Sequence, residues 1–157
     1  MPESVDGLLH DLQASRERLL AVVAGVTEEQ FKRRPPVESV PVAGDWSIAE
    51  VLAHLLAVEQ RRCTRLEALL RGENEPAPRL TDEERNTEAR HGRTVPVPQI
   101  IHGLLAARRR LERALPPEAN DTIAALVRED VIAHEGEHRA QIEAVKAVLG
   151  AARPSRG

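Results

Sequence analysis

The sequence predicts an all-α protein, a four-helix bundle with two long connections between its helices. Apolar residues recur at three- and four-residue spacing over four long segments, which is typical of helices that bury one face. The chain contains one Trp, one Phe and no Tyr, and Ala, Leu and Val dominate its apolar residues, a composition that strands do not favour. A length of 157 residues suits a single domain. We expect it to cover residues 1–150, followed by a short flexible tail at 151–157.

The first two long helices follow from apolar spacing and from capping residues. The first is predicted at residues 4–24, and a capping-box pattern at Thr27 and Gln30 then predicts a short helical turn. Residues 33–45 contain three prolines and a glycine and are predicted to be loop. A second capping box, Ser47 with Glu50, opens the next helix, which Gly72 ends.

The second half of the chain predicts two more long helices. Residues 73–98 form another long connection, with a polar middle that could be partly helical. Pro98 is suited to the first position of the third helix, and Pro116 ends it. The fourth helix is predicted from about Asp121 to Leu149, and no strand is evident. Connections this long are often functional lids, and we expect at least one of them to join parallel helices.

Composition excludes several classes of function. The 22 basic and 25 acidic residues give a net charge of −3, so no basic field attracts nucleic acid, and base-stacking aromatic residues are lacking. A single cysteine excludes a disulfide framework and a cysteine-based zinc site. The first residues are acidic, and Gly25 interrupts the longest apolar run. We therefore expect neither a signal peptide nor a membrane span, and a cytoplasmic location.

Polar residues on the apolar face of the fourth helix point to a metal site. At roughly 100° per residue, Asp130, His134, His138 and Gln141 fall on one line within the apolar stripe. Two histidines four residues apart can bind one metal ion, and burying such a row is costly unless its members are paired or coordinate something. The alternative is that helices packed against them supply hydrogen-bond partners to both histidines. A metal needs at least a third ligand.

The segment that begins at His134 also matches the H-E-x-x-H pattern of zinc proteases, in which Glu135 would be the general base. No histidine follows His138, and Glu143 is out of phase with the pair by roughly 140°. Such proteases also hold substrate on a strand edge. The context therefore argues against a protease.

A third candidate ligand comes from two sequence motifs taken together. Residues 45–54 place the only Trp at the start of the second helix and His54 two turns in, and His-x-x-x-His-x-x-Gln-Ile follows near the end of the chain. Together these motifs resemble the DinB-like (YfiT-like) superfamily, four-helix bundles with a three-histidine metal site. The resemblance implies that His54, His134 and His138 bind one divalent metal. From helical phase alone, His54 lies beside the apolar stripe and could equally be a surface residue.

The resemblance implies a metal site more firmly than a reaction. Characterised members include bacillithiol S-transferases and mycothiol-dependent isomerases, others are described only as metal-dependent hydrolases, and members often form homodimers. We therefore expect an enzyme of thiol-S-transferase or hydrolase type that acts on a small molecule. The metal would be Zn or Ni, with Fe or Mn as further options, and the thiol cofactor bacillithiol or mycothiol. The alternatives are a non-catalytic metal-binding or stress-response protein, and a helical partner-binding module without metal.

Other residues complete the predicted site. Asp130 and Gln141 are candidates for contacts around the ligands, and Glu135 is a candidate base although its phase turns it away from the pair. Arg108 lies in the apolar stripe of the third helix, where a buried ion pair is favoured over binding of a substrate anion. Trp46 would plug the end of the bundle and shape the pocket. The remaining histidines and the cysteine are not assigned to the site: His10, His91, His102 and Cys63.

Overall fold

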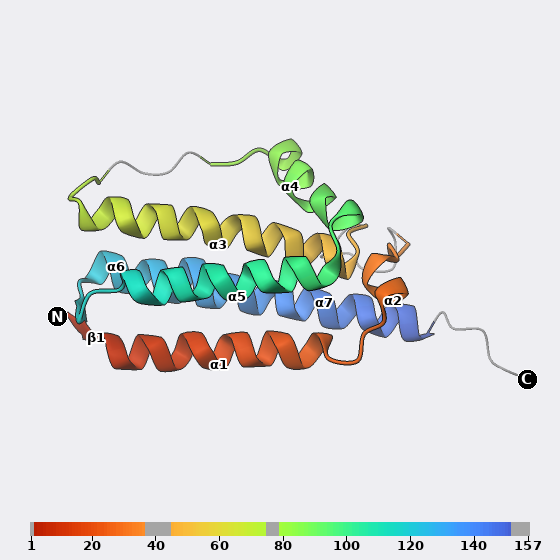
Figure 1. Cartoon of the computed structure of the whole chain (residues 1–157), viewed down its shortest axis with the longest axis horizontal. Helices are drawn as coiled ribbons and strands as arrows, with labels where there is room; N and C mark the ends of the chain where they lie inside the picture. The colour runs from red at the N-terminus through yellow and green to blue at the C-terminus, as the bar shows by residue number, and fades with distance from the viewer. Residues whose placement is uncertain (1, 37–44, 75–78, 152–157) are drawn as a thin grey trace, which may run out of the picture.

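Four long helical segments lie side by side in the computed structural model, which describes residues 2–36, 45–74 and 79–151 (Figure 1). Three of them are α1 (Val5–Val23), α3 (Ile48–Leu70) and α5 (Val97–Ala114). The fourth is continuous from α6 (Asp121–Ala125) through the π-helix η2 (Leu126–Ala133) into α7 (His134–Ala151). The predicted four-helix fold is confirmed.

The direction of the helices agrees with the length of the connections. In Figure 1, α1 and α7 run one way along the bundle and α3 and α5 run the other way. The chain between α3 and α5 therefore returns along the bundle before α5 begins, so that the two helices are parallel neighbours. The expectation that one long connection joins parallel helices is confirmed.

Local sequence explains most helix boundaries. The capping boxes predicted at Thr27–Gln30 and Ser47–Glu50 are both present, and they begin α2 (Glu28–Lys32) and α3. Pro98 is the second residue of α5 rather than the first, a position where its missing N–H costs no helical hydrogen bond.

The connection between α3 and α5 contains a further helix, α4 (Asp82–Thr94), where the sequence predicts only a polar and partly helical middle. A third capping box, formed by Thr81 and Glu84, begins it. α4 lies across the first turns of α3, and a Cβ atom on Gly92 would be 2.4 Å from the carbonyl oxygen of Ala49. The Lys32 ammonium of α2 donates hydrogen bonds to the carbonyl oxygens of Gly92 (2.7 Å) and Val95 (2.6 Å) at the end of α4. These contacts fix α4 on the bundle.

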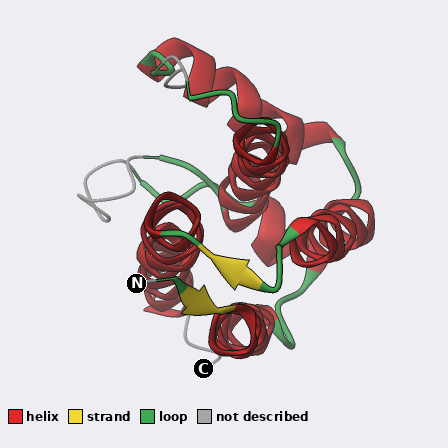
Figure 2. Cartoon of the chain, turned by 90° about the vertical axis from the view of Figure 1, so that its left-hand side faces the viewer, coloured by secondary structure: helices red, strands yellow, loops and turns green. Residues whose placement is uncertain are grey.

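Two very short strands are also present, although the sequence shows no evident strand. β1 (Glu3–Ser4) pairs in antiparallel fashion with β2 (Glu118–Ala119), across the end of the bundle where α1 begins (Figure 2). A two-residue pairing is too short to produce the alternation of apolar and polar residues by which a strand is predicted.

Among the described residues, the core consists of two mainly aliphatic clusters at successive levels of the bundle. One is built around Leu19, Ile48, Leu104 and Ile142, and the other around Leu12, Leu66, Leu111 and Val127. Four charged side chains, one from each long helical segment, are buried between these clusters: Arg16, Glu59, Arg108 and Glu135. No helix in the described part of the chain is both long and apolar enough to span a bilayer.

Candidate metal centre

The site is built where α3, α7 and α4 meet. His54 projects from the second turn of α3 and is only 3% exposed, so the flank position that its phase indicates is buried by neighbouring helices. The centroid of its ring lies 5.2 Å from that of Trp46 and 4.9 Å from that of His138. The ring of His134 is 5.7 Å away. The tertiary structure therefore brings His54 to the pair on α7.

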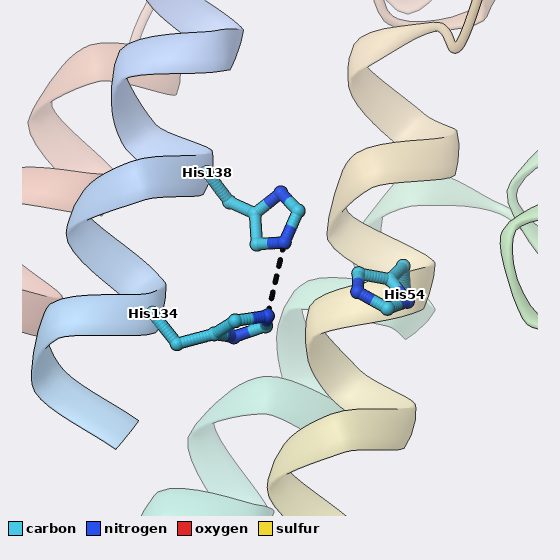
Figure 3. A group of neighbouring side chains, drawn as sticks. All are labelled: His54, His134 and His138. Atoms are coloured by element: carbon cyan, nitrogen blue, oxygen red, sulfur yellow. Dashed lines mark hydrogen bonds between the residues drawn. The ribbon is translucent and has the colours of Figure 1, made fainter. Parts of the chain in front are cut away.

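His134 and His138 lie one turn apart on α7, and both face α3 (Figure 3). Their Nε2 atoms are 3.1 Å apart. Two imidazole nitrogens that each lie about 2.0–2.1 Å from one metal ion are separated by roughly 3–3.4 Å, so this spacing fits shared coordination. Without a metal, one Nε2–H would donate a hydrogen bond to the other nitrogen.

All three histidines fit one ion. One ring nitrogen from each of His54, His134 and His138 lies within 4.8 Å of the others. Three nitrogen ligands suit Zn²⁺, Ni²⁺ and Fe²⁺, and they leave coordination positions open, as in catalytic rather than sealed structural sites.

Hydrogen bonds at the Nδ1 atoms orient two of the three imidazole rings. Nδ1 of His54 is 3.2 Å from Oε2 of Glu88 on α4, and Nδ1 of His138 is 2.6 Å from Oε1 of Gln141. Both oxygens only accept, so each Nδ1 carries the proton and each Nε2 keeps its lone pair for a metal. Glu88 is itself paired with Arg61 of α3. Gln141 and Glu88 thus each contact one of the candidate ligands, and Glu88 is not among the residues that the sequence predicts for the site.

The imidazoles are held in the neutral form that metal binding requires. Burial lowers the pKa of His54 to about 3, with a further contribution from His138 and His134. Burial and His138 lower the pKa of His134 to about 4. Burial also lowers the pKa of His138. Protons therefore do not compete for these nitrogens near neutral pH.

Two predicted acidic residues lie outside the histidine cluster. Asp130 is exposed, so its predicted place in a buried row is wrong. The count of 100° per residue assumes an unbroken α-helix, and the wider turns of η2 alter the phase of residues before His134. Asp130 still lines a small cavity together with His134.

Glu135 is buried among charged partners rather than at the histidines. Its carboxylate accepts hydrogen bonds from Ser15 Oγ (2.5 Å) and Arg16 Nε (2.9 Å), and Arg108 Nη2 lies 3.2 Å away. Burial alone would raise the pKa of Glu135, but Arg108 and Arg16 lower it below its usual value. Glu135 is thus held as a carboxylate by two arginines, which does not favour the role of a general base.

Arg108 forms the buried ion pair that the sequence favours. Its guanidinium donates to both carboxylate oxygens of Glu59, at 3.1 Å and 2.8 Å. Arg16 also donates to Glu59, at 2.7 Å. Arg16 and Glu59 were not predicted, yet each lies in the apolar stripe of its own helix, the same signal that singles out Arg108.

Trp46, Cys63 and the other histidines take different places in the fold. Trp46 is half-buried and donates from Nε1 to Oδ1 of Asn86 at 3.0 Å, so it joins α4 to the start of α3 beside His54. Cys63 is fully buried, and burial raises the pKa of its thiol to about 11. The other three histidines are exposed and do not join the site: His10, His91 and His102.

Comparison with known proteins identifies the family of this chain. No curated protein and no solved structure matches the chain. The family model of the DinB superfamily matches residues 11–142, which include all three histidines and most of the bundle. The chain therefore belongs to the DinB superfamily.

Proposed function

We propose that this protein is a metal-dependent enzyme that binds one divalent ion through His54, His134 and His138. The observation that carries the proposal is the convergence of three neutral imidazoles from two helices within 4.8 Å. Zn²⁺ or Ni²⁺ suits the nitrogen donors best, and Fe²⁺ or Mn²⁺ remains an option. Such an ion acts as a Lewis acid that lowers the pKa of a coordinated water or thiol.

The reaction we propose is transfer to a low-molecular-weight thiol such as bacillithiol or mycothiol, or hydrolysis of a small molecule. The chain does not supply its own nucleophile for thiol transfer. The thiol of Cys63 is buried, donates to the carbonyl oxygen of Ala107 at 3.4 Å and has a raised pKa. A thiol substrate must therefore come from outside the chain, and a cytoplasmic location would supply one.

In this proposal, three histidines bind the metal and neighbouring residues orient their imidazole rings. Glu88 and Gln141 fix the two rings that they contact, so that the Nε2 lone pairs of His54 and His138 converge. Trp46 packs against His54 at a centroid distance of 5.2 Å, and this contact helps to hold the imidazole in place.

Metal analysis tests the site. Protein stripped with a chelator and reloaded with Zn²⁺ should hold about one ion per chain, and His134→Ala less than about 0.1. His102→Ala is the matched control, because this histidine is exposed and lies outside the site. Less than about 0.1 ion per chain in loaded wild-type protein, with the stability of His134→Ala unchanged, would refute the metal site and favour a partner-binding module without metal.

Activity assays then separate an enzyme from a non-catalytic metal-binding protein. Loaded and stripped protein are compared for conjugation of bacillithiol or mycothiol to an electrophile, and for hydrolysis of ester and amide substrates. The proposal expects turnover that needs both the metal and His134. A fully loaded protein that turns over neither substrate class would favour a metal-binding stress-response protein.

A further inference from the structure

We propose that Arg62 binds a carboxylate group of the substrate beside the metal centre, so that the enzyme acts on a small acid. This inference rests on the proposed function and names the substrate class of the same site. It starts from a cavity of about 10 Å³ between α3 and the fourth helical segment, lined by Arg62, Asp130 and His134 among others. That volume holds one water-sized group, which is the size of one carboxylate oxygen.

Arg62 lines this cavity, and its guanidinium has an unused donor. Its Nε is buried and has no hydrogen-bond partner among the described residues. A buried donor without a partner is destabilising, and an acceptor that enters the cavity removes this cost. Arg61, which precedes Arg62 on α3, is already paired with Glu88.

The charge around the cavity favours an anion. Glu59 and Glu135 also line the cavity, but their buried ion pairs with Arg16 and Arg108 neutralise these two carboxylates. Three neutral histidines leave the two charges of a bound divalent ion uncompensated. Arg62 adds a further positive charge that acts on His134. Of the carboxylates that line the cavity, Asp130 alone is exposed, and it cannot balance these charges by itself.

The identity of the donor selects a carboxylate. The cavity has room for one carboxylate oxygen, and the Nε–H of a charged guanidinium binds such an oxygen through a charge-assisted hydrogen bond, which is stronger than a bond to a neutral acceptor. Because Arg62 and His134 line one cavity, an acid bound by Arg62 lies directly beside the metal ligands. Arg62 would thereby set substrate specificity and orientation.

The test measures binding of acetate, a carboxylate probe, and imidazole, a neutral probe, to protein loaded with Co²⁺, followed by the visible spectrum of the ion. Arg62→Met should weaken acetate binding by about tenfold or more and leave imidazole binding within about twofold. Arg62→Lys should restore part of the acetate affinity. Arg109→Met is the control, because Arg109 is exposed on α5.

Each result that would contradict the proposal has its own pattern of acetate and imidazole affinities. Equal acetate affinity in wild type and Arg62→Met overturns the proposal, and so does parallel weakening of acetate and imidazole, which would report damage to the metal site. Asp130→Asn should strengthen acetate binding, because it removes a competing anion from the lining of the cavity, and weaker binding in this variant would contradict the proposal. A wild-type protein without a cobalt spectrum refutes the proposed function itself, whereas an intact spectrum with indifferent acetate binding refutes only this inference.

Discussion

Nδ1 of His54 on α3 lies 3.2 Å from Oε2 of Glu88 on α4, and this hydrogen bond joins the candidate metal centre to the helix that crosses over it. Arg61 holds the other oxygen of the same carboxylate. The orientation of one imidazole therefore depends on a helix outside the four-helix core.

Removal of this carboxylate should weaken metal binding. Glu88→Ala leaves Nδ1 of His54 without its acceptor, and loss of such a partner typically costs about 10–100-fold in metal affinity. Glu83→Ala, an exposed position on the same helix, should leave the affinity unchanged. Competition with a chromogenic chelator measures both dissociation constants, and equal values would contradict the orienting role of Glu88.

A methyl group at Gly92 should displace α4. The Cβ atom of Gly92→Ala would lie 2.4 Å from the Ala49 carbonyl oxygen and 2.6 Å from Cα of Glu50, both rigid backbone atoms. We expect a loss of about 1–3 kcal/mol in the free energy of unfolding, together with weaker metal binding, since Glu88 moves with α4.

Gly7→Ala is the matched control for this substitution. Gly7 lies in α1, and a Cβ atom added there would meet no atom within 4 Å, so alanine should be neutral or stabilise by up to about 1 kcal/mol. Urea denaturation measures both variants. If Gly92→Ala unfolded like Gly7→Ala, the close approach of α4 to α3 would be wrong.

Loss of one charge from the four buried ionic side chains should lower the free energy of unfolding strongly. Glu59→Gln leaves Arg16 and Arg108 buried with only Glu135 to neutralise them, and breaking a buried pair costs about 3–5 kcal/mol. Glu67 lies on the same helix as Glu59, and Glu67→Gln breaks its half-exposed pair with Arg110 of α5, which should cost about 0–1 kcal/mol. Similar denaturation midpoints for the two variants would show that the cluster is not the buried network described above.

The metal-free protein should lose stability as the solution is acidified below pH 6.5. The pKa of His54 is about 3 and that of His134 about 4, against 6.5 for an unperturbed histidine. At a pH between the lowered pKa and 6.5, each of these histidines is protonated in the unfolded chain and neutral in the folded chain. The unfolded chain therefore binds more protons, and the unfolded population increases as the pH falls. Each histidine lowers the free energy of unfolding by up to about 1.4 kcal/mol for each pH unit of acidification.

Urea denaturation of chelator-treated protein between about pH 7 and about pH 5 measures this slope, in a range above the titration of most carboxyl groups. His54→Asn should reduce the slope, because one of the buried histidines is then absent. A stability that does not change over this range would contradict the lowered pKa values.

Features set by neighbouring residues in the sequence were predictable. The capping boxes at Thr27 and Ser47 and the apolar stripes depend on local hydrogen bonds and on helical periodicity, so the helices could be assigned. The packing of α4 against α3 could not, since it depends on the contact of Gly92 with Ala49, which no local pattern reveals.

The site was predictable to a different degree at each residue. His134 and His138 follow from their spacing on one helix, whereas phase left His54 undecided because its burial comes from α4 and α7. Glu88 lies on a polar helix among many acidic residues and carries no distinguishing pattern. Arg16 and Glu59 interrupt the apolar stripes of α1 and α3 as Arg108 interrupts that of α5, so the same signal could have found them.

The four buried charges have a consequence for helix register. The aliphatic clusters above and below them consist of similar side chains, which would tolerate small rotations and axial shifts of a helix. A charged group cannot shift in this way without losing its partners. Glu59 lies on the same helix as His54, and Glu135 directly follows His134, so the ion pairs that align these carboxylates also align the histidines. The distances between the three candidate ligands are therefore fixed partly by side chains that lie outside the candidate metal centre.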